Sequence, residues 1–239
     1  MFPGYQVAAQ EQNLPRPTKS TKFYFNGAGY VIYLNVDKSI AREIIDEDYD
    51  IYIDNKAMYG VEGNDKYGYE VEAYFFANKK KKIFDIQDYQ IGKGKVYCIT
   101  MIDYKYTGRQ GFAYRYRLYT IDENGKKIYS DYSKETVIVP YVTGNSMMIE
   151  RGNEITVYWS KMKGAKSYTV YLCEDGGKRS KKITTTKKNY AKINKNKFKR
   201  NVYYYYYVQA NGIKYKNKKY NSTKKLKGNH YIQLLYVYR

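Results

Sequence analysis

The strongest constraint on the fold is the stretch from Glu154 to Cys173, EITVYWSKMKGAKSYTVYLC, in which two alternating runs flank a short break rich in Lys and Gly. Alternation with a period of two is typical of β-strands that bury one face. Trp159, the only Trp in the chain, closes the first apolar row. The stretch predicts two neighbouring core strands of a β-sandwich. Their inward residues are Ile155, Val157 and Trp159 in the first strand, and Tyr168, Val170 and Leu172 in the second.

A Trp near the end of one strand, packed beneath a Tyr-x-Val sequence in the next, is similar to strands B and C of a fibronectin type III module. This resemblance implies an all-β fold of two immunoglobulin-like (fibronectin type III-like) β-sandwich domains in tandem. It also implies a tyrosine corner at Tyr204, whose hydroxyl would bond back to the backbone. The matching residue of the first copy is Phe112, which has no hydroxyl. We expect four core residues: Trp159, Tyr168, Val170 and Tyr204.

Length and an internal repeat divide the chain. Its 239 residues suit two sandwich domains of roughly 90–120 residues each. YEVEAYFF parallels YTVYLCED at an offset of 99 residues, and Phe112 corresponds to Tyr204 at an offset of 92. We therefore predict a leader or linker over residues 1–20, a first domain over 21–140 with an insertion near 38–67, a strongly basic second domain over 141–228, and an apolar strand or the start of a further module over 229–239.

The insertion separates two predicted strands of the first domain. Residues 39–48, SIAREIIDED, predict one or two helical turns, residues 49–53 an extra strand, and residues 55–65 a loop. The D-x-D-x-D of residues 46–50 has the form of the start of a calcium loop, but the Gly at position 6 and the Glu at position 12 are absent. A solvated acidic face is the favoured interpretation.

Turn signals separate the other predicted strands. Asn124-Gly125 and Asn211-Gly212 predict hairpin turns, because Asn-Gly supplies the positive φ that such turns need. The tetralysine at residues 79–82 is also expected to turn. The further strands are predicted at residues 22–25, 30–37, 69–76, 83–86, 96–102, 112–120 and 126–139 of the first copy, and 147–149, 181–186, 190–193, 202–210 and 215–226 of the second.

The charge is uneven along the chain. Residues 1–140 contain 20 Lys/Arg and 19 Asp/Glu, whereas residues 141–239 contain 23 Lys/Arg and 4 Asp/Glu, so the second part has a net charge of +19. After Asp175 there is no acidic residue. Such asymmetry favours a polyanionic partner for this half, although a soluble, self-repelling surface explains it equally well.

The sequence shows no catalytic constellation. The sole His, His230, has no Cys or Ser in a recognisable motif context. Cys98 and Cys173 fall in different predicted domains without metal-ligand spacing, so we expect two buried free thiols and neither metal nor cofactor. No apolar run reaches the ~18 residues that cross a bilayer. We predict a protein that is not an enzyme, although carboxylates paired in space are invisible at this stage.

The candidate binding surface is the basic, aromatic part of the second domain. Lysines bind phosphate or carboxylate as mobile point charges, and exposed Tyr rings stack on sugars or bases. The alternative is solvated loops with Tyr covering the strands. The candidate residues lie near the C–C′ turn and around the F–G hairpin: Lys181, Lys182, Lys214, Tyr215, Lys216, Lys218, Lys219 and Tyr220.

The resemblance implies an extracellular module of a bacterial surface or secreted protein, acting as a spacer or as an adhesive unit for glycans, proteins or anionic wall polymer. Residues 7–9, Val-Ala-Ala, have the small-x-small form of a signal-peptidase site, but no apolar region precedes them. Two other functions stay open: linker domains of a secreted carbohydrate-active enzyme, and a nucleic-acid-binding protein. Against the latter, Lys far outnumbers Arg after residue 175, whereas base readout draws on Arg, Asn and Gln.

Overall fold

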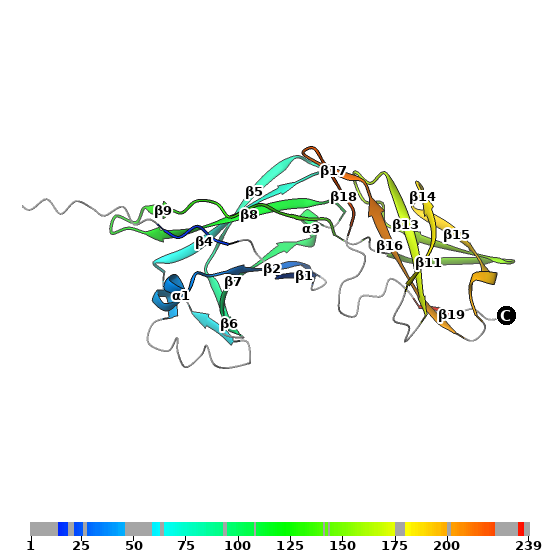
Figure 1. Cartoon of the computed structure of the whole chain (residues 1–239), viewed down its shortest axis with the longest axis horizontal. Helices are drawn as coiled ribbons and strands as arrows, with labels where there is room; N and C mark the ends of the chain where they lie inside the picture. The colour runs from blue at the N-terminus through cyan, green and yellow to red at the C-terminus, as the bar shows by residue number, and fades with distance from the viewer. Residues whose placement is uncertain are drawn as a thin grey trace, which may run out of the picture.

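The computed structural model contains two apolar cores that divide between Ile138 and Val139. Figure 1 shows the corresponding groups of strands side by side along the long axis of the molecule. We call the described residues up to 138 the first module and those from 139 the second module. The structure describes residues 14–18, 22–25, 28–45, 59–62, 65–92, 95–107, 109–140, 142, 144–174, 180–199, 202–222 and 234–236.

The first module consists of two antiparallel sheets. The first has the order β1 (Lys22–Phe25), β2 (Gly29–Asn35), β7 (Lys95–Asp103), β6 (Asp88–Gly92) and β3 (Tyr59–Glu62). The second has the order β10 (Thr136–Ile138), β8 (Phe112–Ile121), β4 (Tyr67–Phe75) and β5 (Lys80–Ile86), with β9 (Lys127–Tyr129) also paired to β8. Two helices join strands: α1 (Lys38–Ile45) follows β2, and α3 (Tyr104–Thr107) follows β7.

The second module repeats this plan with fewer strands. One sheet has the order β11 (Gly144–Arg151), β12 (Glu154–Trp159) and β15 (Tyr190–Asn194). The other has the order β14 (Ser180–Thr186), β13 (Ser167–Glu174), β16 (Tyr203–Asn211) and β19 (Leu234–Tyr236). A hairpin of β17 (Ile213–Tyr215) and β18 (Lys218–Tyr220) follows β16, and the 3-10 helix η2 (Lys195–Lys197) follows β15. These are the A-B-E and C′-C-F-G sheets of the predicted fibronectin type III-like sandwich.

The register of the strands matches the repeat seen in the sequence. Val71 of β4 pairs with Tyr116 of β8, and Val170 of β13 pairs with Val208 of β16. Val170 follows Val71 by the predicted offset of 99 residues, and Val208 follows Tyr116 by the predicted offset of 92. The two modules therefore have the same central strand pair in the same register.

The core of the second module has the predicted anchor. The Trp159 side chain is fully buried, and its ring lies 5.6 Å from the ring of Tyr168 at an angle of 58°. The Tyr204 hydroxyl accepts the backbone N–H of Lys199 at 2.8 Å, which confirms the predicted tyrosine corner. This bond ties the start of β16 to the segment that precedes it.

In the first module, a different side chain stabilises the equivalent corner before β8. Phe112 packs against other aromatic rings in the core and has no hydroxyl to offer. Instead Gln110, a buried residue two positions earlier, accepts the backbone N–H of Ala77 at 2.8 Å and donates to the carbonyl of Tyr106 at 2.7 Å. One side-chain amide thus links the turn after β4 to helix α3.

The insertion agrees with the sequence in part. Helix α1 is present where helical turns were predicted, and it buries Ile40 and Ile44. The loop predicted at residues 55–65 is wrong in part, because β3 lies within it and pairs with β6, a strand that was not predicted. The open edge of β6 supplies backbone partners that local turn signals do not reveal. The predicted strand at 49–53 and the acidic residues 46–50 lie outside the described residues.

Two predicted turns are displaced along the chain. The turn after β4 spans residues 76–79, and Lys80 already belongs to β5. Lysines fit there because β5 is an edge strand, where charged side chains face water. Asn211-Gly212 is not the hairpin turn: Gly212 bends the chain with φ +72°, and the hairpin turns at Lys216, with φ +50°. Of the strand predicted at 215–226, only residue 215 in β17 and β18 are found, and β19 takes the place beside β16. Residues 223–226 lie outside the described residues.

Candidate binding surface between the modules

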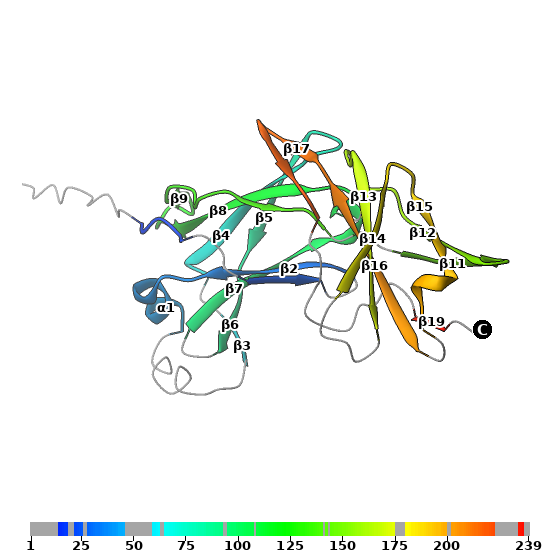
Figure 2. The same ribbon diagram turned by 45° about the vertical axis from the view of Figure 1, so that its right-hand side comes forward.

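The β17–β18 hairpin of the second module packs on the first module through Tyr215. The ring of Tyr215 stacks on Phe76 with centroids 4.3 Å apart and planes 11° apart, and it lies 5.8 Å from the ring of Tyr74. Figures 1 and 2 show the hairpin beside the turn that joins β4 and β5. Offset stacking of this kind adds about 0.5–1.5 kcal/mol beyond the buried area. The stacking therefore holds the two modules together.

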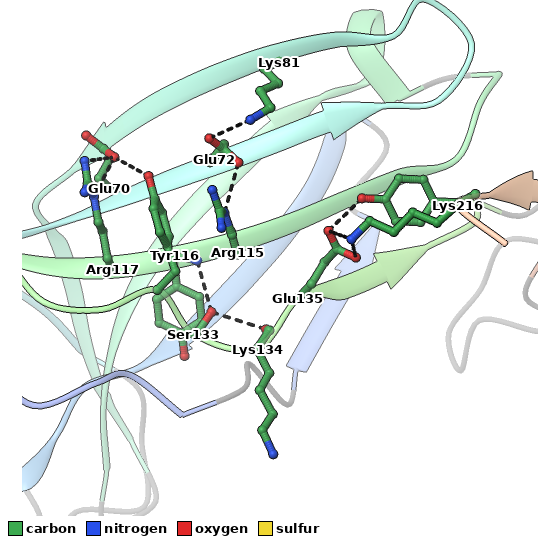
Figure 3. A network of polar contacts seen from close by, with 12 residues as sticks. Glu70, Glu72, Lys81, Arg115, Tyr116, Arg117, Ser133, Lys134, Glu135 and Lys216 are labelled. Atoms are coloured by element: carbon green, nitrogen blue, oxygen red, sulfur yellow. Dashed lines mark hydrogen bonds and ion pairs between the residues drawn. The ribbon is translucent and has the colours of Figure 1, made fainter. Parts of the chain in front are cut away.

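Polar contacts strengthen the same junction. Glu135, which precedes β10, accepts the Tyr215 hydroxyl at 2.6 Å and the Lys216 ammonium at 3.0 and 3.1 Å (Figure 3). Burial, together with the hydrogen bond to this carboxylate, raises the pKa of Tyr215, so the phenol stays neutral as a donor. A backbone bond from the N–H of Lys163 to the carbonyl of Arg109, 2.8 Å long, links the modules at a second point.

A pocket of about 590 Å³ lies where the hairpin meets β4 and β8. Rings of both modules line it, among them Tyr74, Phe76 and Tyr215. Its charged lining has five cations and two carboxylates, so the pocket is electropositive. The cations are Lys79, Lys81, Arg115, Lys214 and Lys216, and the carboxylates are Glu72 and Glu135.

Glu72 is held by cations of its own module. Arg115 binds one carboxylate oxygen at 3.0 Å and Lys81 the other at 3.3 Å (Figure 3). Burial alone would raise the pKa of Glu72, but the hydrogen bonds from Arg115 and Lys81 outweigh it and lower this pKa. The Glu72 carboxylate is therefore ionised, and its charge is already balanced by Arg115 and Lys81. Within the described residues, Lys79 and Lys214 have no carboxylate partner.

The same outward face continues away from the pocket. Arg117 contacts Glu70 at 2.8 Å, and the Tyr132 hydroxyl donates to Glu70 at 2.9 Å. The guanidinium groups of Arg115 and Arg117 lie 3.9 and 4.7 Å from the centre of the Tyr132 ring. Burial and the bond to Glu70 raise the pKa of Tyr132 to about 12. We call Glu70, Glu72, Arg115, Arg117 and Tyr132 the charge ladder.

The structure separates the residues that the sequence grouped as one binding surface. Lys214, Tyr215 and Lys216 line the pocket, but Tyr215 is buried against the first module and does not present its ring to solvent. Tyr220 is half-buried and packs on the core of the second module. The remaining lysines are exposed outside the pocket lining: Lys181 and Lys182 on β14, and Lys218 and Lys219 on β18.

The first module's share of the pocket was missed in the sequence. Lys79 lies in a predicted turn without a predicted role, and Arg115 and Glu135 lie in predicted strands. One signal was available: Glu70 and Glu72 alternate with inward residues on one predicted strand, as do Arg115 and Arg117 on its neighbour. Opposite charges on the outward faces of adjacent strands predict cross-strand pairs.

The two thiols differ in their surroundings. Both cysteines are free, and Cys98 is buried in the first core, where burial raises the pKa of its thiol. Cys173 is half-buried rather than buried. Among the residues that the structure describes, no cluster of three or more His, Cys, Asp or Glu side chains could hold a metal ion. No helix in the described ranges is long and apolar enough to span a membrane.

The likenesses of this chain to known proteins are distant. No family model and no curated protein matches the chain. Among solved structures, a two-domain fibronectin type III segment of chicken tenascin is 13% identical over 88% of this chain and 100% of its own, with a TM-score of 0.33. The FN1–FN3 domains of chicken CNTN1 are 13% identical over 88% of this chain and 64% of their own, with a TM-score of 0.30. Both scores are low, so the fold is assigned on the strand order of each module.

The strand order and the internal register define the chain as a pair of tandem fibronectin type III-like modules with an all-β architecture.

Proposed function

We propose that the chain is a non-catalytic spacer and adhesive unit of an extracellular surface or secreted protein, and that its second module binds an anionic polymer. One observation carries the proposal: the exposed lysines of β14 and β18 have no carboxylate partner among the described residues, whereas Glu70 and Glu72 on the first module's outer face are paired with its own cations. Unpaired lysines are suited to the carboxylate, sulfate or phosphate groups of a polymer.

The junction supports the role of a spacer. The stack of Tyr215 on Phe76, the Glu135–Lys216 ion pair and the Lys163–Arg109 backbone bond fix three points between the modules. A pair of sandwiches joined in this way keeps a defined length and orientation, because relative motion of the modules would break several contacts together. A stiff spacer can hold the basic face away from whatever the chain is attached to.

The test is binding of the full chain to immobilised heparin, teichoic acid, a neutral glucan and duplex DNA over a series of salt concentrations. We expect binding to the anionic wall polymer or polysaccharide, none to the neutral glucan, and weaker binding to DNA. The double variants Lys181→Gln/Lys182→Gln and Lys218→Gln/Lys219→Gln should each weaken binding about tenfold, since each removes two charged contacts.

A matched control removes two exposed lysines of the first module, Lys126→Gln/Lys134→Gln. It lowers the net charge by the same amount and should change binding less than about twofold. Equal losses in all three variants, with equal affinity for DNA and polysaccharide, would mean non-specific attraction and would contradict the proposal. Absence of binding to any anionic polymer would also contradict it.

A further inference from the structure

We propose that the pocket between the modules is a second site, for a short acidic saccharide whose sugar units carry a carboxylate. The location of this site follows from the junction alone, but its ligand class rests on the proposed function. The pocket has a volume of about 590 Å³, which lies within the range of about 300–1,000 Å³ usual for small-ligand sites. This is room for a few sugar rings and too little for a folded partner.

The charges of the pocket select an anion. Its two carboxylates already bind Arg115, Lys81 and Lys216, so they do not neutralise the remaining cations. Those are Lys79, at the end of the β4–β5 turn, and Lys214, on β17. One belongs to each module, so they line the same pocket only because the hairpin is docked. A carboxylate between them would receive charge-assisted hydrogen bonds from both sides.

The remaining lining distinguishes a sugar acid from a phosphodiester or an inorganic anion. The carboxylates of Glu72 and Glu135 have lone pairs beyond those used by Lys81, Arg115 and the hairpin, and they can accept hydroxyl donors. The backbone of a DNA strand has no free hydroxyl between its phosphates, so it offers these carboxylates no donor. The ring of Tyr74 adds an apolar surface for the C–H face of a sugar ring.

The experiment is calorimetric titration of the full chain with tetragalacturonate, a tetramer of an uronic acid, at physiological ionic strength. We expect one site per chain. The variant Lys79→Asn/Lys214→Gln should weaken binding at least tenfold, and Asn is chosen because it tolerates the positive φ of residue 79. Lys181→Gln/Lys182→Gln removes the same charge outside the pocket and should change the affinity less than twofold.

A second variant tests the dependence on docking. Phe76→Ala removes the ring on which Tyr215 stacks, so it should weaken tetragalacturonate binding at least tenfold while the chain retains its binding to long anionic polymer. If Lys181→Gln/Lys182→Gln reduces tetragalacturonate binding and the pocket variants do not, the pocket is not the site, although the proposed function stands. If sulfate or a tetranucleotide of equal charge competes as well as tetragalacturonate, the assignment to a sugar acid is wrong.

If neither tetragalacturonate nor the long polymer binds, the proposed function and the pocket site both fail. If the long polymer binds and tetragalacturonate does not, only the pocket site fails. If tetragalacturonate alone binds, and the pocket variants abolish its binding, the site stands without the polymer-binding role of the second module.

Discussion

The outer faces of the two equivalent sheets have different chemistry on the same strand register. The facing pairs are Glu70 with Arg117 and Glu72 with Arg115 in the first module, and Thr169 with Gln209 and Tyr171 with Tyr207 in the second. The first face is the charge ladder, and in the second the rings of Tyr171 and Tyr207 stack 4.9 Å apart with planes 9° apart. The inner faces must stay apolar to fill a core, whereas the outer faces can diverge. The cross-strand ion pairs of this face therefore belong to the first module, whereas the lysines of β14 and β18 in the second have no carboxylate partner among the described residues.

The segments that follow β8 and β16 are partly alike and partly different. In the first module it is YSDYS, residues 129–133, where Ser130 and Ser133 accept the backbone N–H groups of Leu118 and Tyr116. These serines interrupt the single strand predicted at 126–139, which is found as β9 and β10. In the second module Ser222 makes the bond that matches Ser130, to Ala210 at 2.8 Å. The serine contact is shared, but the ladder's tyrosine is not.

The largest difference is expected for removal of an arginine from the ladder. Arg117→Met leaves Glu70, whose side chain is 11% exposed, without its cation, and should lower the free energy of unfolding of the first module by about 2 kcal/mol. The equivalent change in the second module, Gln209→Met, removes neutral hydrogen bonds and should cost about 1 kcal/mol. Hydrogen exchange in urea, followed separately in each module, measures the change in unfolding free energy for both variants. A loss below about 0.5 kcal/mol for Arg117→Met would show that the ladder is not stabilising.

A smaller effect is expected at the corner residues. Tyr204→Phe removes the bond from the Lys199 N–H and should destabilise the second module by about 1 kcal/mol. Trp159 fluorescence reports that module specifically, because it contains the only Trp. The reciprocal change, Phe112→Tyr, should bring no gain, since Gln110 already links the turn and the helix. A stabilised Phe112→Tyr variant would contradict this account of the corner.

Salt should act on the two modules with opposite signs. Between about 0.05 and 1 M NaCl, screening weakens the ladder, so the first module should lose about 0.5 kcal/mol. The second module, with its excess of lysines, repels itself and should gain stability under the same screening. Hydrogen exchange at the two salt concentrations separates the modules. Changes of the same sign in both would contradict this difference in charge balance between the modules.

The smallest effect is the pH dependence that Glu72 contributes in the first module. The pKa of Glu72 is lower in the folded state than its ordinary value of 4.5, so the stability it contributes is present above pH 4.5 and is lost as the pH falls through the folded-state value. Stability measured at pH 6 and at pH 3.5 should therefore differ less in Glu72→Gln than in the unaltered chain. An unchanged difference would mean that other carboxylates determine acid stability.

The alternating pattern was sufficient to predict most of the fold. The Trp159–Tyr168 pair, the inward rows of β8 and β16 and the offsets of the repeat follow from apolar periodicity, because burial of one face fixes both register and orientation. Strand β3 and the split of the segment at 126–139 did not follow. They depend on backbone groups of other strands, which no local pattern encodes.

The candidate site was less predictable. Lys214 and Lys216 were selected for their charge, but Tyr215 between them packs on Phe76, far away in the sequence. Its role depends on how one sandwich lies against the other, and only tertiary contacts determine that. The ladder could have been anticipated from the Glu-x-Glu and Arg-x-Arg patterns of two strands already predicted to be neighbours.

The most direct test of the junction is a double-mutant cycle of Phe76→Ala and Tyr215→Ala, measured by urea unfolding of the full chain. These side chains come from different modules and touch each other with centroids 4.3 Å apart. We predict a coupling free energy of about 0.5–1.5 kcal/mol, the usual contribution of such a ring pair. Additive effects, with a coupling indistinguishable from zero, would mean that the modules are not held together here and would contradict the account of the junction and its pocket.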